Sequence, residues 1–352
     1  MIAYYRRDLV ACSRVCKALQ TLANTVIVKH RELEVDDLST LRRRLQQLPI
    51  LADLIEHLDV QSDELLSTFP IEFAGKLHRV DSCSVTGGDA ALSLRTQSRL
   101  AFAQWGTITI LELYNVIFST FTEFVRFVSC LPNLRQLLLF DVSHKTGEMY
   151  NLKRAAFAQR LSLQYFRNIS RDISPCWRIL TAPRLSQSLT RLEVDINEVI
   201  LRQCGPLPRL QLPILQTLGV QFFMNRLPAL SSLFAIFLSQ WPQNHISTIE
   251  ITFLLYPERE PQLFGSDRKL SRHCLDMIDR ALCLPQFKCL QRVNVKFTSL
   301  YFADDAEYLR SNGVLLFPRL GVRRILNLSM SGKGVDVVEM IVDLDIADHV
   351  RQ

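Results

Sequence analysis

The sequence predicts an α/β protein built as an array of similar strand-and-helix units. In five places a bulky apolar residue followed by proline precedes a short strand-like apolar pattern by five to eight residues. Helix-like stretches with apolar residues at three- and four-residue spacing lie between these strands. Because proline cannot continue a helix and favours extended backbone before it, each unit should run helix, proline break, strand and loop. The five phrases are Leu131-Pro132, Leu212-Pro213, Trp241-Pro242, Leu284-Pro285 and Phe317-Pro318.

Ten segments approach the strand template of leucine-rich repeats, apolar-x-x-apolar-x-apolar. Their middle apolar residues are Leu58, Val80, Leu111, Leu137, Leu161, Leu192, Leu218, Ile249, Val293 and Leu326. The intervals between them are mostly longer than the ~20–29 residues of regular repeats. We therefore expect an irregular leucine-rich-repeat solenoid over residues 35–352, with a parallel concave sheet and helices on the convex face. An ordinary α/β fold with alternating strands and helices is the alternative.

Residues that alternate with the strand anchors should point away from the core, onto the concave face. Solenoids use such faces to bind partners, although the same pattern also describes the solvated side of any sheet. The candidate partner-binding residues are Glu112, Tyr114, Gln136, Phe140, Arg191, Glu193, Asp195, Glu250, Arg292 and Lys296. Further positions with the same alternation are His57, Asp59, Arg79, Asp81, Arg160, Gln164, Gln221 and Asn294.

The composition indicates in which compartment the protein resides and which kinds of ligand it is not expected to bind. The chain has 352 residues, a net charge of +6 and only 12 glycines, which argues against glycine-rich phosphate loops. Nine cysteines without a paired framework, and no secretory N-terminus, predict reduced thiols in the cytoplasm or nucleus. The most apolar stretch, 227–238, is too short to span a bilayer and should form a buried helix. We expect no cofactor, no membrane association and no nucleic-acid partner.

The N-terminal segment differs from the repeats. Leu9, Cys12, Cys16 and Leu19 recur at three- and four-residue spacing, which predicts a helix with one apolar stripe. Residues 8–23 resemble the C-terminal half of an F-box, the helical motif that docks substrate receptors onto the Skp-family adaptor of SCF ubiquitin ligases. The matching string is Asp8-Leu9, Ala11-Cys12-Ser13, Val15-Cys16-Lys17 and Leu22-Ala23.

With the repeats, the whole chain resembles a divergent fungal-type F-box and leucine-rich-repeat protein. The resemblance implies a partial F-box over residues 1–34, with Leu9, Cys12, Val15, Cys16 and Leu19 facing the adaptor or the motif's own core. Two features depart from the family. Its opening Leu-Pro helix is missing before Asp8, and its usual tryptophan is Leu19 here. Either the chain begins downstream of the true start or the motif is degenerate. The same residues could instead pack as an N-terminal cap of the repeats.

Two cysteine clusters suggest chemistry that other features do not support. Cys12 and Cys16 are one helical turn apart, but no second Cys/His pair with zinc spacing lies nearby, so packing is favoured over metal binding. His273 and Cys274 could form a Cys-His nucleophile, yet cysteine on such a helix usually serves as a small buried apolar residue. The sequence contains no phosphate-loop, dinucleotide-binding, zincin or nucleophile-elbow motif.

The leading expectation is a non-enzymatic substrate-recognition subunit of an SCF-type ubiquitin ligase. Its N-terminal helix would bind the Skp-family adaptor and cullin complex, and its concave face would bind a target protein whose identity the sequence does not give. Two alternatives remain. One is a leucine-rich-repeat interaction module with no link to ubiquitin, and the other is a Cys/His enzyme.

Overall fold

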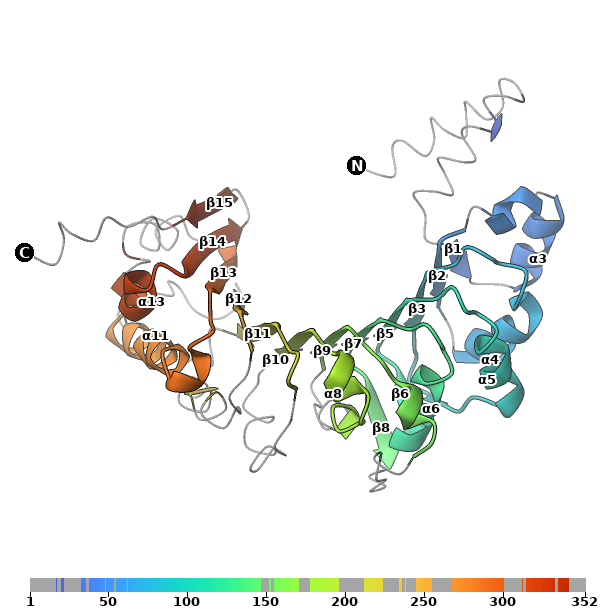
Figure 1. The fold of residues 1–352 in the computed structure, drawn as a ribbon. Coiled ribbons are helices and arrows are strands. Elements are labelled where there is room, and N and C mark those ends of the chain that lie inside the picture. Colours follow the sequence, from blue (N-terminus) through green and yellow to red (C-terminus); the bar gives the residue numbers. More distant parts are fainter. Residues whose placement is uncertain are drawn as a thin grey trace, which may run out of the picture. The chain divides into compact units, whose positions relative to one another are not determined.

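A computed structural model shows how the chain folds (Figure 1). It describes residues 17, 20–21, 33–35, 38–47, 49–53, 55–61, 63–146, 152, 155–170, 178–195, 212–223, 234–235, 238, 245–254, 268–300, 312, 315–332 and 335–341. Its contacts divide the chain into two compact units. Unit 1 holds Met1–Leu163 with Ala182–Arg184, and unit 2 holds Gln164–Thr181 with Leu185–Gln352.

The main sheet of unit 1 is entirely parallel. Its strands, in spatial order, are β1 (Leu33–Val35), β2 (His57–Val60), β3 (Ser82–Thr86), β5 (Ile110–Tyr114) and β7 (Gln136–Phe140). Each pair of neighbours is consecutive along the chain except for short intervening strands. The helices between them are α3 (Leu38–Gln47), α4 (Asp63–Phe73), α5 (Thr96–Phe102) and α6 (Phe121–Val128), with the 3-10 turn η1 (Pro49–Asp53). A second 3-10 turn, η3 (Ala158–Arg160), follows β7 in the chain.

A second, smaller parallel sheet in unit 1 was not expected from the sequence. It pairs β4 (Ala91–Leu92), β6 (Ile117–Thr120) and β8 (Ser143–Thr146). β6 leads directly into α6, whose first turn is capped because the Thr120 hydroxyl accepts from the Glu123 amide at 3.1 Å. The apolar spacing that predicts this helix is confirmed, since Phe121, Phe124 and Val128 are all buried.

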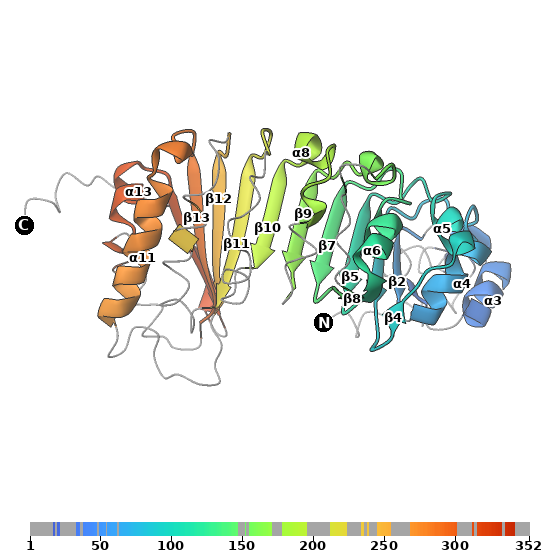
Figure 2. The same cartoon turned by 90° about the horizontal axis from the view of Figure 1, so that it is seen from below.

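Unit 2 repeats the arrangement. Its parallel strands are β9 (Tyr165–Ile169), β10 (Arg191–Asp195), β11 (Thr217–Phe223), β12 (Thr248–Leu254), β13 (Arg292–Leu300) and β14 (Leu326–Gly332). β15 (Val335–Ile341) then pairs with β14 in the antiparallel sense. The described helices are α8 (Leu185–Ser188), α11 (Arg268–Leu282) and α13 (Pro318–Val322), with the 3-10 turn η5 (Pro285–Phe287). Figure 2 shows α11 and α13 on one side of the C-terminal strands.

The predicted α/β class and parallel strand arrangement are confirmed inside each unit, and the strand anchors fall into register. In unit 2 one row joins Phe166, Leu192, Leu218, Ile249, Val293 and Leu326. In unit 1 the corresponding row joins Leu58, Cys83, Leu111 and Leu137. All ten side chains are buried. Aligned apolar residues on consecutive parallel strands form one continuous core layer per unit.

Two predicted anchors are wrong. Val80 and Leu161 are buried but precede their strands, and the true anchors are Cys83 and Phe166. The leucine template favoured the aliphatic residues, whereas burial of a cysteine or a phenylalanine satisfies the same core position.

A phenylalanine ladder adds to the core of unit 2. Phe222, Phe253 and Phe297 are paired in register on three successive strands. Their rings stack with centroid separations of 5.7 and 5.0 Å, and Phe234 meets Phe222 edge-to-face at 4.7 Å. All four are buried, so this layer excludes water beneath the C-terminal halves of β11 to β13.

Each strand is also positioned by a repeated backbone motif. The carbonyl just before a strand accepts two consecutive amides from the start of the next strand. Gln164 accepts from Thr190 and Arg191, both at 3.0 Å, and Gln216 accepts from Ser247 and Thr248, both at 3.0 Å. The other carbonyls that do this are Glu56, Asp81, Thr109, Thr190 and Ser247. This ladder fixes where strands begin, whatever the length of the segments between them.

The proline phrase has a more varied role than predicted. Pro132 and Pro213 lie in turns just before β7 and β11, as expected for a helix break. Pro285 and Pro318, however, begin the short helices η5 and α13, where a missing amide costs nothing. Trp241-Pro242 lies outside the described residues.

The structure describes three residues of the predicted N-terminal helix. Lys17, Gln20 and Thr21 are helical, and the Thr21 hydroxyl donates to the Lys17 carbonyl at 3.0 Å. The predicted adaptor residues Leu9, Cys12, Val15, Cys16 and Leu19 lie outside the described residues, so the boundary expected after residue 34 stays a prediction. Among the described helices, none has the length and apolarity needed to cross a membrane.

Candidate binding face

Alternation along the strands gives each sheet one buried face and one face that solvent reaches. On β12, Ile249, Ile251 and Phe253 are buried, whereas Glu250 and Thr252 between them are half-buried. The solvent-reached side of unit 2 is called the outward face here and comprises the alternate positions of β9 to β13. Those whose side chains the structure describes are Tyr165, Arg167, Ile169, Arg191, Glu193, Asp195, Thr217, Gly219, Gln221, Thr248, Glu250, Thr252, Leu254, Arg292, Asn294, Lys296 and Thr298.

Five predicted partner-binding residues reach solvent on the outward face: Arg191, Glu193, Glu250, Arg292 and Lys296. Asp195 has the same alternation, but only 6% of it is exposed, so a partner cannot contact it extensively. Glu112, Tyr114, Gln136 and Phe140 occupy the equivalent positions of β5 and β7 in unit 1, where all four are half-buried.

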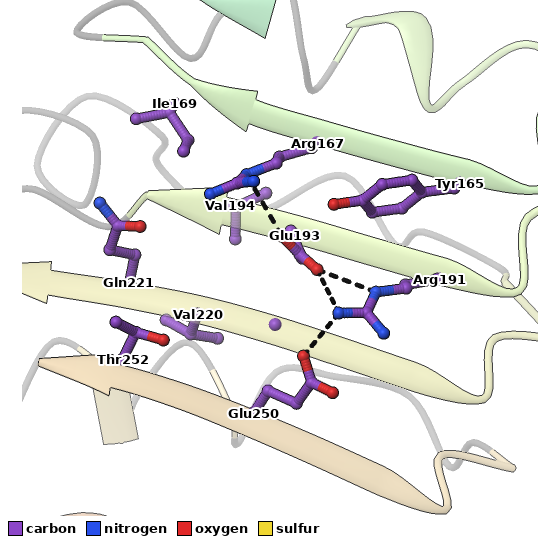
Figure 3. A pocket seen from close by; sticks show the side chains of 11 residues that line it. Tyr165, Arg167, Ile169, Arg191, Glu193, Val194, Val220, Gln221, Glu250 and Thr252 are labelled. Atoms are coloured by element: carbon purple, nitrogen blue, oxygen red, sulfur yellow. Dashed lines mark hydrogen bonds and ion pairs between the residues drawn. The ribbon is translucent and has the colours of Figure 1, made fainter. Parts of the chain in front are cut away.

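An ion-pair cluster occupies the middle of the outward face (Figure 3). Arg191 on β10 donates to the Glu193 carboxylate at 2.8 Å through Nε and 2.5 Å through a terminal nitrogen. The same terminal nitrogen donates at 2.7 Å to Glu250 on β12. Arg167 on β9 approaches the other Glu193 oxygen at 3.3 Å. One guanidinium therefore joins two carboxylates across an intervening strand, an arrangement stronger than a single exposed ion pair.

Gly219 makes that crossing possible. It lies on β11, paired with Glu193 on one side and Glu250 on the other. A Cβ atom at this position would lie 2.4 Å from Cγ of Glu193. The empty position lets the Glu193 side chain lean over β11 and leaves a hollow lined by residues of β9 to β12, among them Gln221 and Thr252.

Tyr165 closes one end of the cluster. The Arg191 guanidinium lies 5.4 Å from the centre of its ring, in the range of a cation–π contact. Burial, together with the adjacent Glu193 carboxylate, raises the pKa of the Tyr165 phenol to about 12. The phenol therefore stays neutral at physiological pH and acts as a polar wall of the hollow, not as a base.

The sequence reasoning missed Tyr165, Arg167 and Gly219. Taking Leu161 as the anchor placed Arg160 and Gln164 on the binding face, whereas both precede β9. The same error at Val80 placed Arg79 and Asp81 there, in place of Ser82, Ser84 and Thr86 of β3. Glycine inside a strand was an available signal, because it commonly marks a place where another group approaches the backbone closely.

The solvent-reached positions of unit 1 have a different chemistry. Tyr114 and Phe140 are paired on neighbouring strands, and their rings stack at 4.5 Å with an interplanar angle of 5°. The Tyr114 hydroxyl donates to Glu112 at 2.5 Å. Ile110 and Leu138 are half-buried beside them. These positions combine aromatic and aliphatic surface with one carboxylate, a composition that suits protein contact.

The residues considered for catalysis or metal binding are not brought together where the structure describes them. His273 is exposed and Cys274 is 2% exposed, as expected for consecutive residues that project in different directions from α11. Within the described ranges no cluster of three or more His, Cys, Asp or Glu side chains could hold a metal ion. Cys12 and Cys16 lie outside those ranges.

No model of a protein family matches the chain, and no curated protein matches it. Among solved structures, the leucine-rich repeat-containing protein LegL7 from Legionella pneumophila is similar over 80% of this chain and 93% of its own. The identity is 14% and the TM-score is 0.39.

Proposed function

We propose that the protein is a non-enzymatic binding module that holds a protein partner on the solvent-reached faces of its parallel sheets. The ion-pair cluster of Arg167, Arg191, Glu193 and Glu250 carries this proposal. It is preorganised by mutual contacts, lies in a hollow, and presents charged groups of both signs on a rigid scaffold of strands. Charge patterns of this kind fix the register and selectivity of protein interfaces.

The binding face can be tested by photo-crosslinking. A benzophenone amino acid is introduced at Thr252, half-buried on the outward face, and separately at Arg272, exposed on α11. Full-length protein carrying each is irradiated in cells, and adducts are identified by mass spectrometry. We expect a specific adduct at 252 that is absent at 272. Equal adducts at both positions, or none at 252, would contradict the assignment of this face.

A more specific role is suggested by the resemblance of residues 8–23 to an F-box. We propose as the second candidate that the partner is a substrate for ubiquitination and that the N-terminal helix recruits a Skp-family adaptor. The helical state of Lys17, Gln20 and Thr21 suits this role, and it suits an N-terminal cap equally well.

A pull-down with purified Skp-family adaptor separates the two candidates. The chain is used both as it stands and extended with its upstream coding sequence, and Leu9→Asp with Val15→Asp serves as the disrupted control. Retention of the adaptor that the double substitution abolishes supports the ligase role. No retention by either form would leave the binding module without a ubiquitin link.

A further inference from the structure

We propose that the partner segment bound by the outward face of unit 2 is acidic. This inference rests on the proposed function and specifies its chemistry. It follows from which charged groups of the face reach solvent and which are held beneath them, together with the spacing of the exposed cations.

The cations lie above the carboxylates. The side chains of Arg167 and Arg191 are 33% and 42% exposed, whereas those of Glu193 and Glu250 are 18% and 30% exposed. Asp195, the third acidic residue at an outward position, is only 6% exposed. A partner approaching the sheet therefore meets guanidinium groups first, with the acidic groups already engaged by them.

Strand β13 adds two cations whose charge is not neutralised within the described structure. Arg292 and Lys296 are both exposed on the outward face, and no ion pair to either is formed by the described residues. Asn294 between them is instead hydrogen-bonded to Asn327, at 3.0 Å. Binding a carboxylate at Arg292 or Lys296 would thus disrupt no existing ion pair.

The spacing of these cations matches an extended acidic segment. Arg292 and Lys296 are four residues apart on one strand, about 13 Å. Arg191 and Arg292 lie in one cross-strand row separated by Thr217 and Thr248, which puts their backbones about 14 Å apart. The hollow above Gly219 lies beside this row. Two or three carboxylates of one peptide can therefore reach separate cations.

Nucleic acid fits the face less well. The aromatic ring described on the outward face, Tyr165, is already covered by Arg191, so it offers no open surface on which a base could stack. Single-stranded nucleic acids generally require an uninterrupted basic groove with open stacking surfaces.

The test uses fluorescein-labelled twelve-residue peptides and full-length protein. Fluorescence anisotropy compares peptides that alternate Ser with Glu, Gln or Lys, at about 50 and 300 mM NaCl, a range over which exposed charges become screened. Oligothymidylate of twelve nucleotides is the nucleic-acid probe. The variant Arg292→Glu with Lys296→Glu reverses the unpaired cations, and Arg79→Glu with Arg135→Glu makes the same charge change at exposed positions of unit 1. Circular dichroism checks that both variants are folded.

We expect the Glu peptide to bind best, and the unit 2 variant to weaken it at least tenfold while the unit 1 variant changes it less than threefold. If both variants lost affinity for the Glu peptide equally, the effect would be one of net charge and the proposal would be overturned. The proposal would also be overturned if the Glu peptide did not bind, or if the Gln peptide bound equally well. Tighter binding of oligothymidylate, lost in the unit 2 variant, would assign the face to nucleic acid.

The two proposals can fail separately. A protein crosslinked at position 252 through a segment without acidic residues would retain the binding function and refute the acidic partner. Absence of any crosslink at 252 would refute the binding function itself, whatever the peptides do.

Discussion

At position 219 the absence of a side chain shapes the chemistry of the whole outward face. Glu193 fills the space that a Cβ atom would take, and Arg191 reaches across it to Glu250. Glycine usually weakens a strand, but here it is a condition for an ion-pair cluster whose residues come from β9, β10 and β12. Gly219, which has no side chain, thus determines where the charged side chains of Glu193, Arg191 and Glu250 lie.

We predict that Gly219→Ala destabilises the protein, because its methyl group would displace Glu193 in a packed sheet, at a cost of about 1–3 kcal/mol. Urea denaturation measures the change. In a Glu193→Ala background the same substitution should cost much less, since the obstructing side chain is gone. A double-mutant cycle with no coupling between the two positions would contradict this account.

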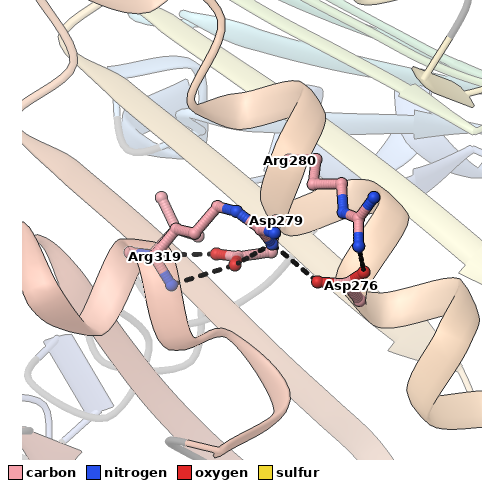
Figure 4. Close-up of polar contacts among 5 residues, drawn as sticks. Asp276, Asp279, Arg280 and Arg319 are labelled. Carbon is pink, nitrogen blue, oxygen red and sulfur yellow. Dashed lines mark hydrogen bonds and ion pairs between the residues drawn. The ribbon is translucent and has the colours of Figure 1, made fainter.

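Among the elements, helix α11 supplies the N-terminal cap of helix α13. Asp279 on α11 accepts from the backbone amides of Arg319 and Leu320, both at 3.0 Å, at the start of α13 (Figure 4). Phe317 provides no side-chain cap of its own. Arg319 also donates to Asp276 at 2.6 Å, and Arg280 pairs with the same carboxylate at 2.7 Å. Burial raises the pKa of Asp279, whereas hydrogen bonding from Arg319 lowers that of Asp276.

Removing this cap should destabilise the C-terminal strands. We expect Asp279→Ala to lower the free energy of unfolding by about 2 kcal/mol, because two backbone amides, one of them buried, lose their acceptor. Asp276→Asn, at a more exposed position, should cost clearly less. Urea denaturation of both variants gives the comparison, and equal effects would argue against a capping role.

Helices α3 and α4 are joined by a bidentate ion pair that gives a pH dependence. Arg42 donates to both Glu72 oxygens, at 2.5 and 2.7 Å, and this hydrogen bonding lowers the pKa of Glu72. A carboxyl group whose pKa is lower in the folded than in the unfolded protein stabilises the fold at pH values above its unfolded-state pKa of about 4.3. This stabilisation is lost as the pH falls through the folded-state pKa.

We therefore expect Glu72→Gln to reduce the melting temperature at pH 7, with the difference from wild type decreasing as the pH falls below about 4. Thermal melts followed by circular dichroism at several pH values would show it. A difference that persists undiminished at pH 3 would mean that Glu72 acts through packing instead of charge.

The elements differ in how far the sequence could predict them. Eight of the ten anchors follow from the apolar period, which records burial directly. The errors at Val80 and Leu161 arose because burial alone does not distinguish a strand residue from a buried turn residue next to it. Positions of Arg191 and Glu250 on the same face were predictable from alternation, but their contact across β11 depends on register, which single strands do not encode.

For the molecule as a whole, the reactivity of the cysteines tests whether the core of each unit is closed to solvent. Burial raises the pKa of the Cys83 thiol to about 12, and Cys274 in unit 2 is equally enclosed, whereas Cys289 is exposed. We expect iodoacetamide at pH 8 to alkylate Cys289 readily and to spare Cys83 and Cys274 until denaturant is added. Peptide mapping by mass spectrometry follows each site. Rapid native labelling of Cys83 would place it outside a closed core.

The antiparallel strand β15 has a consequence for how such a sheet can grow. A new strand-and-helix unit adds to an array by pairing parallel to the last strand, and that edge of β14 is already occupied by a strand running the opposite way. Duplicated units could thus be inserted only before β14, within the parallel series. The same pairing covers the backbone edge of β14 and makes β15 the last strand in the order of this sheet.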